Sequence, residues 1–237
     1  MLVAFVLVHG GGFAGSCWDR LVPLLNAPGY AVDLPGRGGT PADLATVTTA
    51  DFVDAVATEI LARDLTAVTL VGHSLAGITL PAVAARVGDR LRRLVFIACV
   101  VPPHGERVVD VLDSLSPAVA EVASRIGDAG VTDQGALHPD LAAAMFCNDM
   151  DETQRAFTLE RLVPEALQVI SEPTDLSGLR TPLPRTYVRL LRDASLTPAA
   201  QDRMAANLVN ADVIDLDSGH MAMISHPAEL ASILNSL

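Results

Sequence analysis

The fold of this 237-residue chain is decided by the stretch Thr69-Leu70-Val71-Gly72-His73-Ser74-Leu75-Ala76-Gly77. A run of β-branched and apolar residues ends in the pattern G-x-S-x-A-G, and an apolar pattern with helical spacing follows at once. This order predicts a strand, a sharp turn and a helix, with Ser74 exposed on the turn as a nucleophile. Gly72 and Gly77 are the small neighbours that such a turn requires, and Ala76 stands where the pattern usually ends in glycine. The alternative is that Ser74 only caps the helix, which the preceding strand disfavours.

A glycine-rich segment, Val8-His9-Gly10-Gly11-Gly12, follows the first apolar run of the chain. Glycines at this place let the backbone approach a substrate oxygen closely, so that N–H groups can stabilise its developing negative charge. We expect these N–H groups to be those of Gly11 and Leu75. The alternative is an ordinary glycine turn, and the presence of the serine turn later in the chain favours the oxyanion loop.

His220 is the candidate general base, because it lies in the loop after the last predicted strand. In the strand–turn–helix class of nucleophile, the chain order is serine, acid, histidine. The other five histidines lie in the glycine loop, at the serine turn, in or beside the middle segment, or before Pro227: His9, His73, His104, His138 and His226.

The acid that orients the histidine is predicted by elimination. The strand ending at Cys99 carries no carboxylate at its end, whereas Asp193 follows the next strand directly. Asp202 falls on a predicted helix, Asp215 falls in or at the end of a strand, and Asp217 is very near His220 in sequence. We therefore expect Asp193 to fix the imidazole tautomer. The alternative is a loop residue that pairs with Arg192.

Apolar runs alternate with helical patterns, which predicts an α/β fold with a mainly parallel sheet of about six strands and helices on both faces. The predicted strands are residues 3–8, 31–34, 67–71, 94–100, 186–191 and 212–216. The predicted helices are 18–25, 49–63, 75–87, 198–209 and 227–237. Thr49 or Asp51 is expected to cap the second of these helices and Ser225 the last.

The middle of the chain contains no convincing strand between residues 101 and 184. Its helical patterns cover residues 116–126, 139–146 and 152–167. We expect residues 101–184 to form a helical cap inserted into a core made of residues 1–100 and 185–237. Such a cap would cover a pocket at the carboxyl ends of the strands.

Charge and composition exclude several classes of function. Asp and Glu number 28 and the basic residues 16, which gives a formal net charge of −12 and disfavours nucleic acids and anionic membranes as partners. All basic residues are Arg, so no lysine is present for a Schiff base or a phosphate-binding loop. The use of Arg for Lys, with abundant Ala, also indicates GC-rich coding and a bacterial source.

Neither a metal nor an organic cofactor is predicted. The three cysteines lack C-x-x-C spacing, no cluster of metal-ligating residues is visible, and no G-x-G-x-x-G pattern opens a helix. The N-terminus has no basic region or cleavage site, and no apolar run is long enough to span a bilayer. We therefore expect a cytoplasmic protein, and a homodimer is left open.

The same residues carry a resemblance to a known family. The chain resembles the plant methyl esterase and hydroxynitrile lyase family of α/β-hydrolases and its bacterial relatives, nearly from end to end. The matching segments are residues 5–10, 17–18, 33–36, 72–75, 192–193 and 219–223, with Phe146-Cys147-Asn148-Asp149 similar to bacterial members. The resemblance implies the α/β-hydrolase fold, a Ser74–Asp193–His220 triad and an oxyanion hole at Gly11 and Leu75.

Two departures from the lyases favour the esterase branch of that family. Lyases of this type have a Lys beside the catalytic histidine and a hydroxyl residue in the first oxyanion loop. This chain has Met221 and Gly11 at those places.

The leading hypothesis is a serine hydrolase that cleaves a small, mostly apolar carboxylic ester through an acyl-enzyme. Alternatives are lactone or thioester hydrolysis, a cofactor-free lyase step with the same triad, and a small-molecule receptor, which an intact triad disfavours. The residues expected to contact substrate are Gly12, His73, Phe146 and Met221. In the cap, Phe157 is a second expected pocket aromatic, and Arg161 is expected on a solvated helix face.

Overall fold

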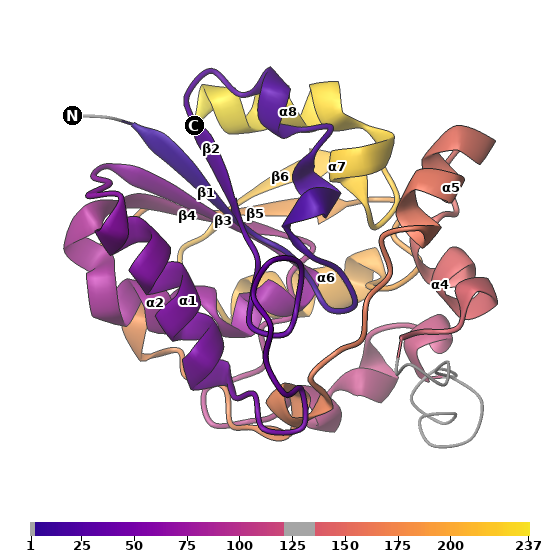
Figure 1. The fold of residues 1–237 in the computed structure, drawn as a ribbon, viewed down its shortest axis with the longest axis horizontal. Helices are drawn as coiled ribbons and strands as arrows, with labels where there is room; N and C mark the ends of the chain where they lie inside the picture. Colours follow the sequence, from indigo (N-terminus) through magenta and orange to yellow (C-terminus); the bar gives the residue numbers. More distant parts are fainter. Residues whose placement is uncertain (1–2, 121–135) are drawn as a thin grey trace.

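A computed structural model describes residues 3–120 and 136–237 of the chain (Figure 1). Six strands form one sheet in the order β2-β1-β3-β4-β5-β6, and every neighbouring pair is parallel. The strands are β1 Ala4–Val8, β2 Gly29–Val32, β3 Val68–His73, β4 Leu91–Ile97, β5 Arg185–Leu190 and β6 Asp212–Leu216. The predicted α/β-hydrolase fold with about six mainly parallel strands is confirmed.

Helices cover both faces of the sheet, with α1 and α2 on one side and α7 and α8 on the other (Figure 1). The helices are α1 Thr49–Ala62, α2 Leu80–Val87, α4 Pro139–Phe146, α5 Glu152–Leu159, α6 Pro198–Ala206, α7 Ala222–Ser225 and α8 Pro227–Ser236. Side chains alternate between the faces of a strand, so Val6 packs in the core beneath α1 and α2, whereas Leu7 packs with Trp18 beneath α8.

Strand register brings the predicted site segments together at one edge. Val8 of β1 lies opposite Gly72 of β3, so the glycine loop after β1 runs beside the serine turn after β3. Leu190 of β5 lies opposite Leu216 of β6, which sets the two following loops side by side. All four segments therefore meet at the carboxyl ends of parallel strands, where ligands bind in open α/β sheets.

Prolines shorten or interrupt three of the predicted helices, because proline lacks the N–H that a helix interior requires. The segment predicted as a helix over 18–25 forms two 3-10 helices, Gly15–Trp18 and Val22–Leu24. The helix predicted over 75–87 begins as a 3-10 helix, Ser74–Ile78, before α2. α5 ends at Leu159, ahead of Pro164.

Helix capping differs in detail from the prediction. Thr48, rather than Thr49, caps α1, and Asp51 completes a reciprocal capping box with it. Ser225 does not cap α8: it ends α7, and the N-cap position of α8 is His226, which makes no side-chain capping hydrogen bond.

The segment between β4 and β5 contributes no strand to the sheet within its described residues. It holds α4, α5 and several 3-10 turns, and α4 and α5 lie to one side of the sheet in Figure 1. Most of the helix predicted over 116–126 lies outside the described residues. No helix in residues 3–120 and 136–237 is both long and apolar enough to cross a membrane.

Candidate active site

Ser74 lies on a strained turn directly after β3. Its φ of +53° is in the left-handed region, which residues other than glycine rarely adopt. Glycine is required around it because the backbone is crowded: a Cβ on Gly10 would lie 2.8 Å from the Ser74 Cβ, and one on Gly77 would lie 2.2 Å from the carbonyl oxygen of Val100. Ala76 is 2% exposed, so the turn accommodates a methyl group where the sequence pattern usually has glycine.

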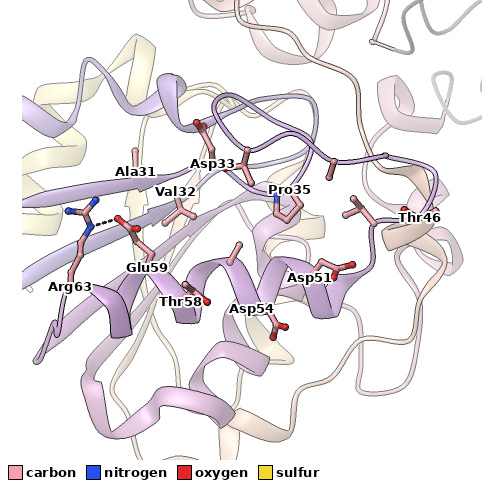
Figure 2. A pocket seen from close by; sticks show the side chains of 14 residues that line it. Ala31, Val32, Asp33, Pro35, Thr46, Asp51, Asp54, Thr58, Glu59 and Arg63 are labelled. Atoms are coloured by element: carbon pink, nitrogen blue, oxygen red, sulfur yellow. Dashed lines mark hydrogen bonds and ion pairs between the residues drawn. The ribbon is translucent and has the colours of Figure 1, made fainter.

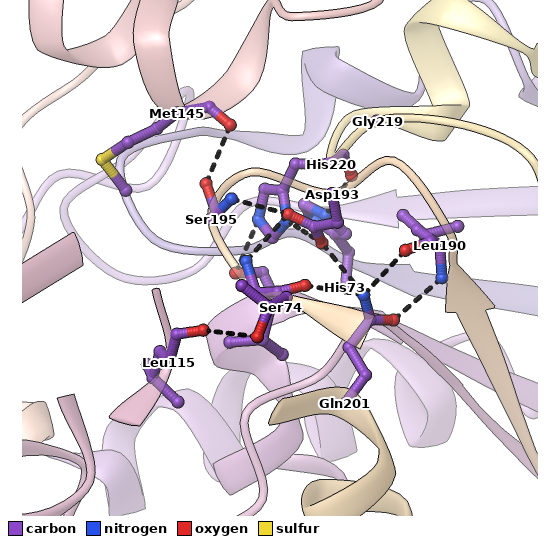
Figure 3. A network of polar contacts seen from close by, with 12 residues as sticks. His73, Ser74, Leu115, Met145, Leu190, Asp193, Ser195, Gln201, Gly219 and His220 are labelled. Atoms are coloured by element: carbon purple, nitrogen blue, oxygen red, sulfur yellow. Dashed lines mark hydrogen bonds and ion pairs between the residues drawn. The ribbon is translucent and has the colours of Figure 1, made fainter. Parts of the chain in front are cut away.

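His220 joins Ser74 to Asp193 in one line of hydrogen bonds (Figure 3). The Ser74 Oγ lies 3.0 Å from the Nε2 atom of His220, and the Nδ1 atom lies 2.7 Å from the Oδ2 atom of Asp193. His220 is 2% exposed and Asp193 is 5% exposed. A proton on Nδ1, held by the carboxylate, leaves Nε2 free to accept the serine proton.

The Asp193 carboxylate is fixed from its other side as well. Its Oδ1 atom accepts hydrogen bonds from the backbone N–H groups of Ser195 and Leu196, at 2.7 and 2.8 Å. The Nε2 atom of Gln201 lies 3.5 Å from Oδ2. Oδ2 therefore has a set direction, toward His220, and the loop after β5 is folded around the carboxylate.

His73 supports His220 from behind and does not line the cavity beside Ser74. Its Nε2–H donates to the carbonyl oxygen of His220 at 2.9 Å. Complete burial, together with the nearby His220, lowers the pKa of His73 well below its ordinary value, so the ring is neutral. Met221 is also fully buried, at the start of α7, and lies outside the cavity lining. The structure therefore does not bring these two expected substrate contacts to the cavity.

The glycine loop is held by hydrogen bonds on both sides. His9 donates from Nδ1 to the Gly10 carbonyl at 2.9 Å and accepts from the N–H of Leu34 at 3.3 Å. Burial lowers the pKa of His9 to about 4, which keeps this ring neutral as well. Gly11 and Leu75 both line the cavity with Ser74. Leu75 is in the first turn of its 3-10 helix, where N–H groups have no intrahelical acceptor.

Glu165 fastens the same loop to the middle segment of the chain. Its Oε2 atom accepts from the N–H of Gly12 at 2.9 Å, and the Gly12 carbonyl accepts from the N–H of Val163 at 2.9 Å. The other carboxylate oxygen forms an ion pair with Arg37, whose side chain is fully buried. Gly12 thus lines the cavity with its N–H already occupied, so of these two glycines Gly11 remains the candidate oxyanion donor.

Sequence reasoning missed Glu165 and Arg37. Both lie in stretches without a recognisable motif, and the contact between Gly12 and Glu165 spans 153 positions. The nearest signal in the sequence is Pro164, which cannot continue a helix and directly precedes Glu165.

The cavity beside Ser74 has a volume of about 200 Å³. Its walls are mostly apolar, and the side chains that line it include Val100, Val108, Leu112, Leu115, Leu137, Met145, Phe146, Leu162, Leu167 and Ile170. The Phe146 ring stacks on the His220 ring, with centroids 5.5 Å apart and an interplanar angle of 22°. Among the described lining residues, Glu165 is the only carboxylate.

Two further side chains of the middle segment, Phe157 and Arg161, lie outside this cavity. Phe157 does not line this cavity: the guanidinium groups of Arg20 and Arg161 lie over its ring. Arg161 pairs with Asp19 at 3.5 Å and lies outside the cavity. It is not on a helix face as predicted, because α5 ends at Leu159 and the Arg161 side chain is only 24% exposed.

A wider cavity of about 670 Å³ lies between α1 and the loop that follows β2 (Figure 2). Its polar lining includes Asp51, Asp54 and Glu59, and Arg63 forms an ion pair with Glu59. Its described lining residues include no serine, cysteine or histidine. Within residues 3–120 and 136–237, no group of three or more His, Cys, Asp or Glu side chains is arranged to hold a metal ion.

Known proteins of similar sequence include esterases. The sequence matches the profile described as "Alpha/beta hydrolase family" over residues 5–233. It is 30% identical to a carbendazim hydrolyzing esterase from Nocardioides sp., over 98% of each chain. It is 28% identical to Methylesterase 18 from Arabidopsis thaliana, over 97% of this chain and 95% of the relative.

Among solved structures, an extracellular alpha/beta-hydrolase from a Paenibacillus species matches with a TM-score of 0.86. The match covers 99% of this chain and 98% of the other, at 22% sequence identity, and it shows the fold.

Proposed function

The chain belongs to the alpha/beta hydrolase family, and from this premise we propose that Ser74, His220 and Asp193 hydrolyse a small, mostly apolar carboxylic ester. The predicted resemblance to plant methyl esterases and bacterial esterases is confirmed by the matching relatives, which support a carboxylic-ester hydrolase. The observation that carries the proposal is the line of hydrogen bonds from Ser74 through His220 to Asp193, which opens into the apolar cavity.

Acylation follows from the positions of these groups. The Ser74 Oγ attacks the ester carbonyl carbon while its proton passes to Nε2 of His220. The carbonyl oxygen becomes an oxyanion and accepts hydrogen bonds from the backbone N–H groups of Gly11 and Leu75. When the tetrahedral intermediate collapses, the alcohol leaves with the proton from Nε2, and the acyl group stays on Ser74.

Deacylation uses the same groups with water as the nucleophile. His220 takes a proton from water as it attacks the acyl carbon, and returns that proton to Ser74 Oγ as the carboxylic acid leaves. Asp193 stays ionised throughout and stabilises the imidazolium that forms in both steps.

The cavity favours a compact substrate. Its volume of about 200 Å³ is below the range of roughly 300 to 1,000 Å³ that is common for drug-sized ligands. Its apolar wall favours aliphatic acyl groups, and Glu165 disfavours esters that carry a carboxylate. A methylesterase among the relatives is consistent with a small alcohol leaving group.

The proposal is tested with a fluorophosphonate probe and with p-nitrophenyl acetate. We expect the probe to label Ser74, and the Ser74→Ala variant to lose labelling and about 10⁵- to 10⁶-fold in kcat. Ser236→Ala is the control, because Ser236 is exposed at the end of α8, away from the cavity, and its hydroxyl likewise donates to a backbone carbonyl, that of Ile233. Labelling of folded wild type at another residue, or none at all, would refute the assignment.

A further inference from the structure

The turn that follows α4 contacts both loops that carry the candidate base and acid. The Nδ2 atom of Asn148 donates to the carbonyl oxygen of Arg192 at 2.7 Å. The Oδ2 atom of Asp149 accepts from the N–H of Gly219 at 2.5 Å. Arg192 directly precedes Asp193, and Gly219 directly precedes His220. One dipeptide therefore binds the backbone one residue before each partner of the His220–Asp193 hydrogen bond.

Asp149 approaches the histidine loop so closely that only glycine fits there. A Cβ on Gly219 would lie 2.5 Å from the Oδ1 atom of Asp149 and 2.8 Å from the Oδ1 atom of Asn148. The Asp149 side chain is 1% exposed. Its Oδ2 atom also accepts from the Ser225 hydroxyl at 3.0 Å and lies 3.3 Å from Nδ1 of His226. The Asp149 carboxylate is thus held in place by Ser225 and His226 as well as by Gly219.

Two residues at the end of α4 contact the same loops. The Met145 carbonyl accepts from the hydroxyl of Ser195, which lies on the Asp193 loop, at 2.9 Å. The Phe146 ring stacks on His220. Together with Asn148 and Asp149, these residues bind the two loops from one short stretch of chain that the triad itself does not include.

We propose that Asn148 and Asp149 form a clamp that positions Asp193 and His220 relative to each other, an inference that rests on the proposed esterase function. The clamp touches neither substrate nor reacting atoms, so both members are positioning residues. Its effect follows from geometry: a displacement of about 1 Å at reacting groups can lower the rate by about 100-fold. The clamp binds the backbone directly before each of the two residues that share the 2.7 Å hydrogen bond between His220 and Asp193.

If Asn148 and Asp149 only held the middle segment on the sheet, their replacement would have different effects. Loss of such a contact would change stability, or the fit of the substrate and hence KM. Loss of the clamp would lower kcat with KM little changed. The lowered kcat would also be the same for every ester, because the His220–Asp193 hydrogen bond is used whatever acyl group is bound.

Asn148→Asp is the main test, because it keeps the size of the side chain and replaces the donor to Arg192 by an acceptor. Asn235→Asp is its matched control: Asn235 also donates from Nδ2 to a backbone carbonyl, that of Leu24, at 3.0 Å. We expect Asn148→Asp to lower kcat by about 10- to 100-fold for p-nitrophenyl acetate, butyrate and hexanoate alike, with KM within about twofold. Asn235→Asp should match wild type.

Variants of Asp149 provide a second, independent test. Asp149→Ala removes the acceptor for Gly219 and should lower kcat as Asn148→Asp does. Asp149→Asn keeps an oxygen that can accept from the same N–H, and should restore most of the activity. If Asn148→Asp does not fold, judged by its melting temperature, Asn148→Ala and the Asp149 pair answer the same question.

A double-mutant cycle shows whether the clamp acts through Asp193. In the Asp193→Asn background the hydrogen bond from Nδ1–H of His220 to a carboxylate is already lost, and with it the productive tautomer, so adding Asn148→Asp should change kcat by less than about twofold. The clamp is overturned if the full penalty persists in that background, if only KM or the melting temperature changes, or if the loss varies with acyl length. These results would leave the esterase proposal intact, whereas wild type that neither reacts with the probe at Ser74 nor cleaves esters would overturn both.

Discussion

Replacing Asp193 by Asn exchanges one carboxylate oxygen for an NH₂ group and should trap His220 in the wrong tautomer. The two carboxylate oxygens of Asp193 have different partners. Oδ1 accepts from the backbone N–H groups of Ser195 and Leu196, and Oδ2 accepts from Nδ1 of His220. If the single oxygen of Asn keeps the two backbone N–H groups, its NH₂ group faces Nδ1, which must then be the acceptor. The imidazole proton moves to Nε2, where it blocks proton transfer from Ser74.

The opposite amide orientation would keep the productive tautomer, but it turns the NH₂ group toward the two backbone N–H groups. Each buried donor left without an acceptor costs about 1 to 3 kcal/mol, so this orientation lies about 2 to 6 kcal/mol above the first. The unproductive tautomer therefore dominates. We expect kcat to fall by about 10⁴-fold, which corresponds to a rise of about 5.5 kcal/mol in the barrier.

The assay is hydrolysis of p-nitrophenyl acetate, with the melting temperature as a check on folding. Asp217→Asn is the control, because Asp217 is close to His220 in sequence but is exposed and pairs with Arg192 at 2.9 Å. The control should retain nearly all activity. Near-normal activity in folded Asp193→Asn, with the loss found in Asp217→Asn, would show that the reasoning about the tautomer is wrong.

Three further predictions concern the cavity, the glycine loop and acid stability. Phe146→Ala should shift the preferred p-nitrophenyl ester toward longer acyl chains, with each added methylene worth about 1 to 3 kcal/mol, and superimposable kcat/KM profiles would show that Phe146 is not a wall of the site. Glu165→Gln leaves Arg37 buried without its counter-charge, so the free energy of unfolding in urea should fall by about 3 kcal/mol and kcat should fall with it, whereas an unchanged midpoint would remove Glu165 as the anchor of Gly12. Burial lowers the pKa of His9 from 6.5 to about 4, so the unfolded chain binds a proton that the folded chain does not, and stability falls as the pH falls from 6.5 to 4. His9→Gln should reduce that slope near pH 5 by about 1.4 kcal/mol per pH unit, and an unchanged slope would show that His9 is not a buried neutral base.

Much of the fold could be predicted because its signals are local. Six apolar runs and the serine turn are each visible within a window of ten residues. The start of β4 could not be predicted from local signals. The prediction began this strand at Leu94, whereas it begins at Leu91. Arg93 pairs with Thr69 of β3 in the sheet, and the strand accepts Arg92 and Arg93 because their guanidinium groups donate to Thr69 on β3 and Thr186 on β5.

The candidate triad could be named from the sequence because each member follows the end of a strand. Parallel strands bring their carboxyl ends to one edge, so chain order alone limits the choice. The side-chain directions could not be predicted in this way. His73 is expected beside the substrate, but its side chain is buried outside the cavity lining and donates to the carbonyl oxygen of His220.

The contacts from the middle segment could not be predicted, since no periodicity links residues so far apart in the chain. They nevertheless reach the groups that perform the proposed chemistry: Glu165 holds Gly12 of the glycine loop, and Asn148 and Asp149 hold the loops of Asp193 and His220. The same segment forms much of the cavity wall. Exchange of residues 101–184 with those of a relative would therefore alter substrate choice and the alignment of the reacting groups together. A graft that keeps Asn148, Asp149 and Glu165 separates the two effects, because it changes the wall and leaves these hydrogen bonds in place.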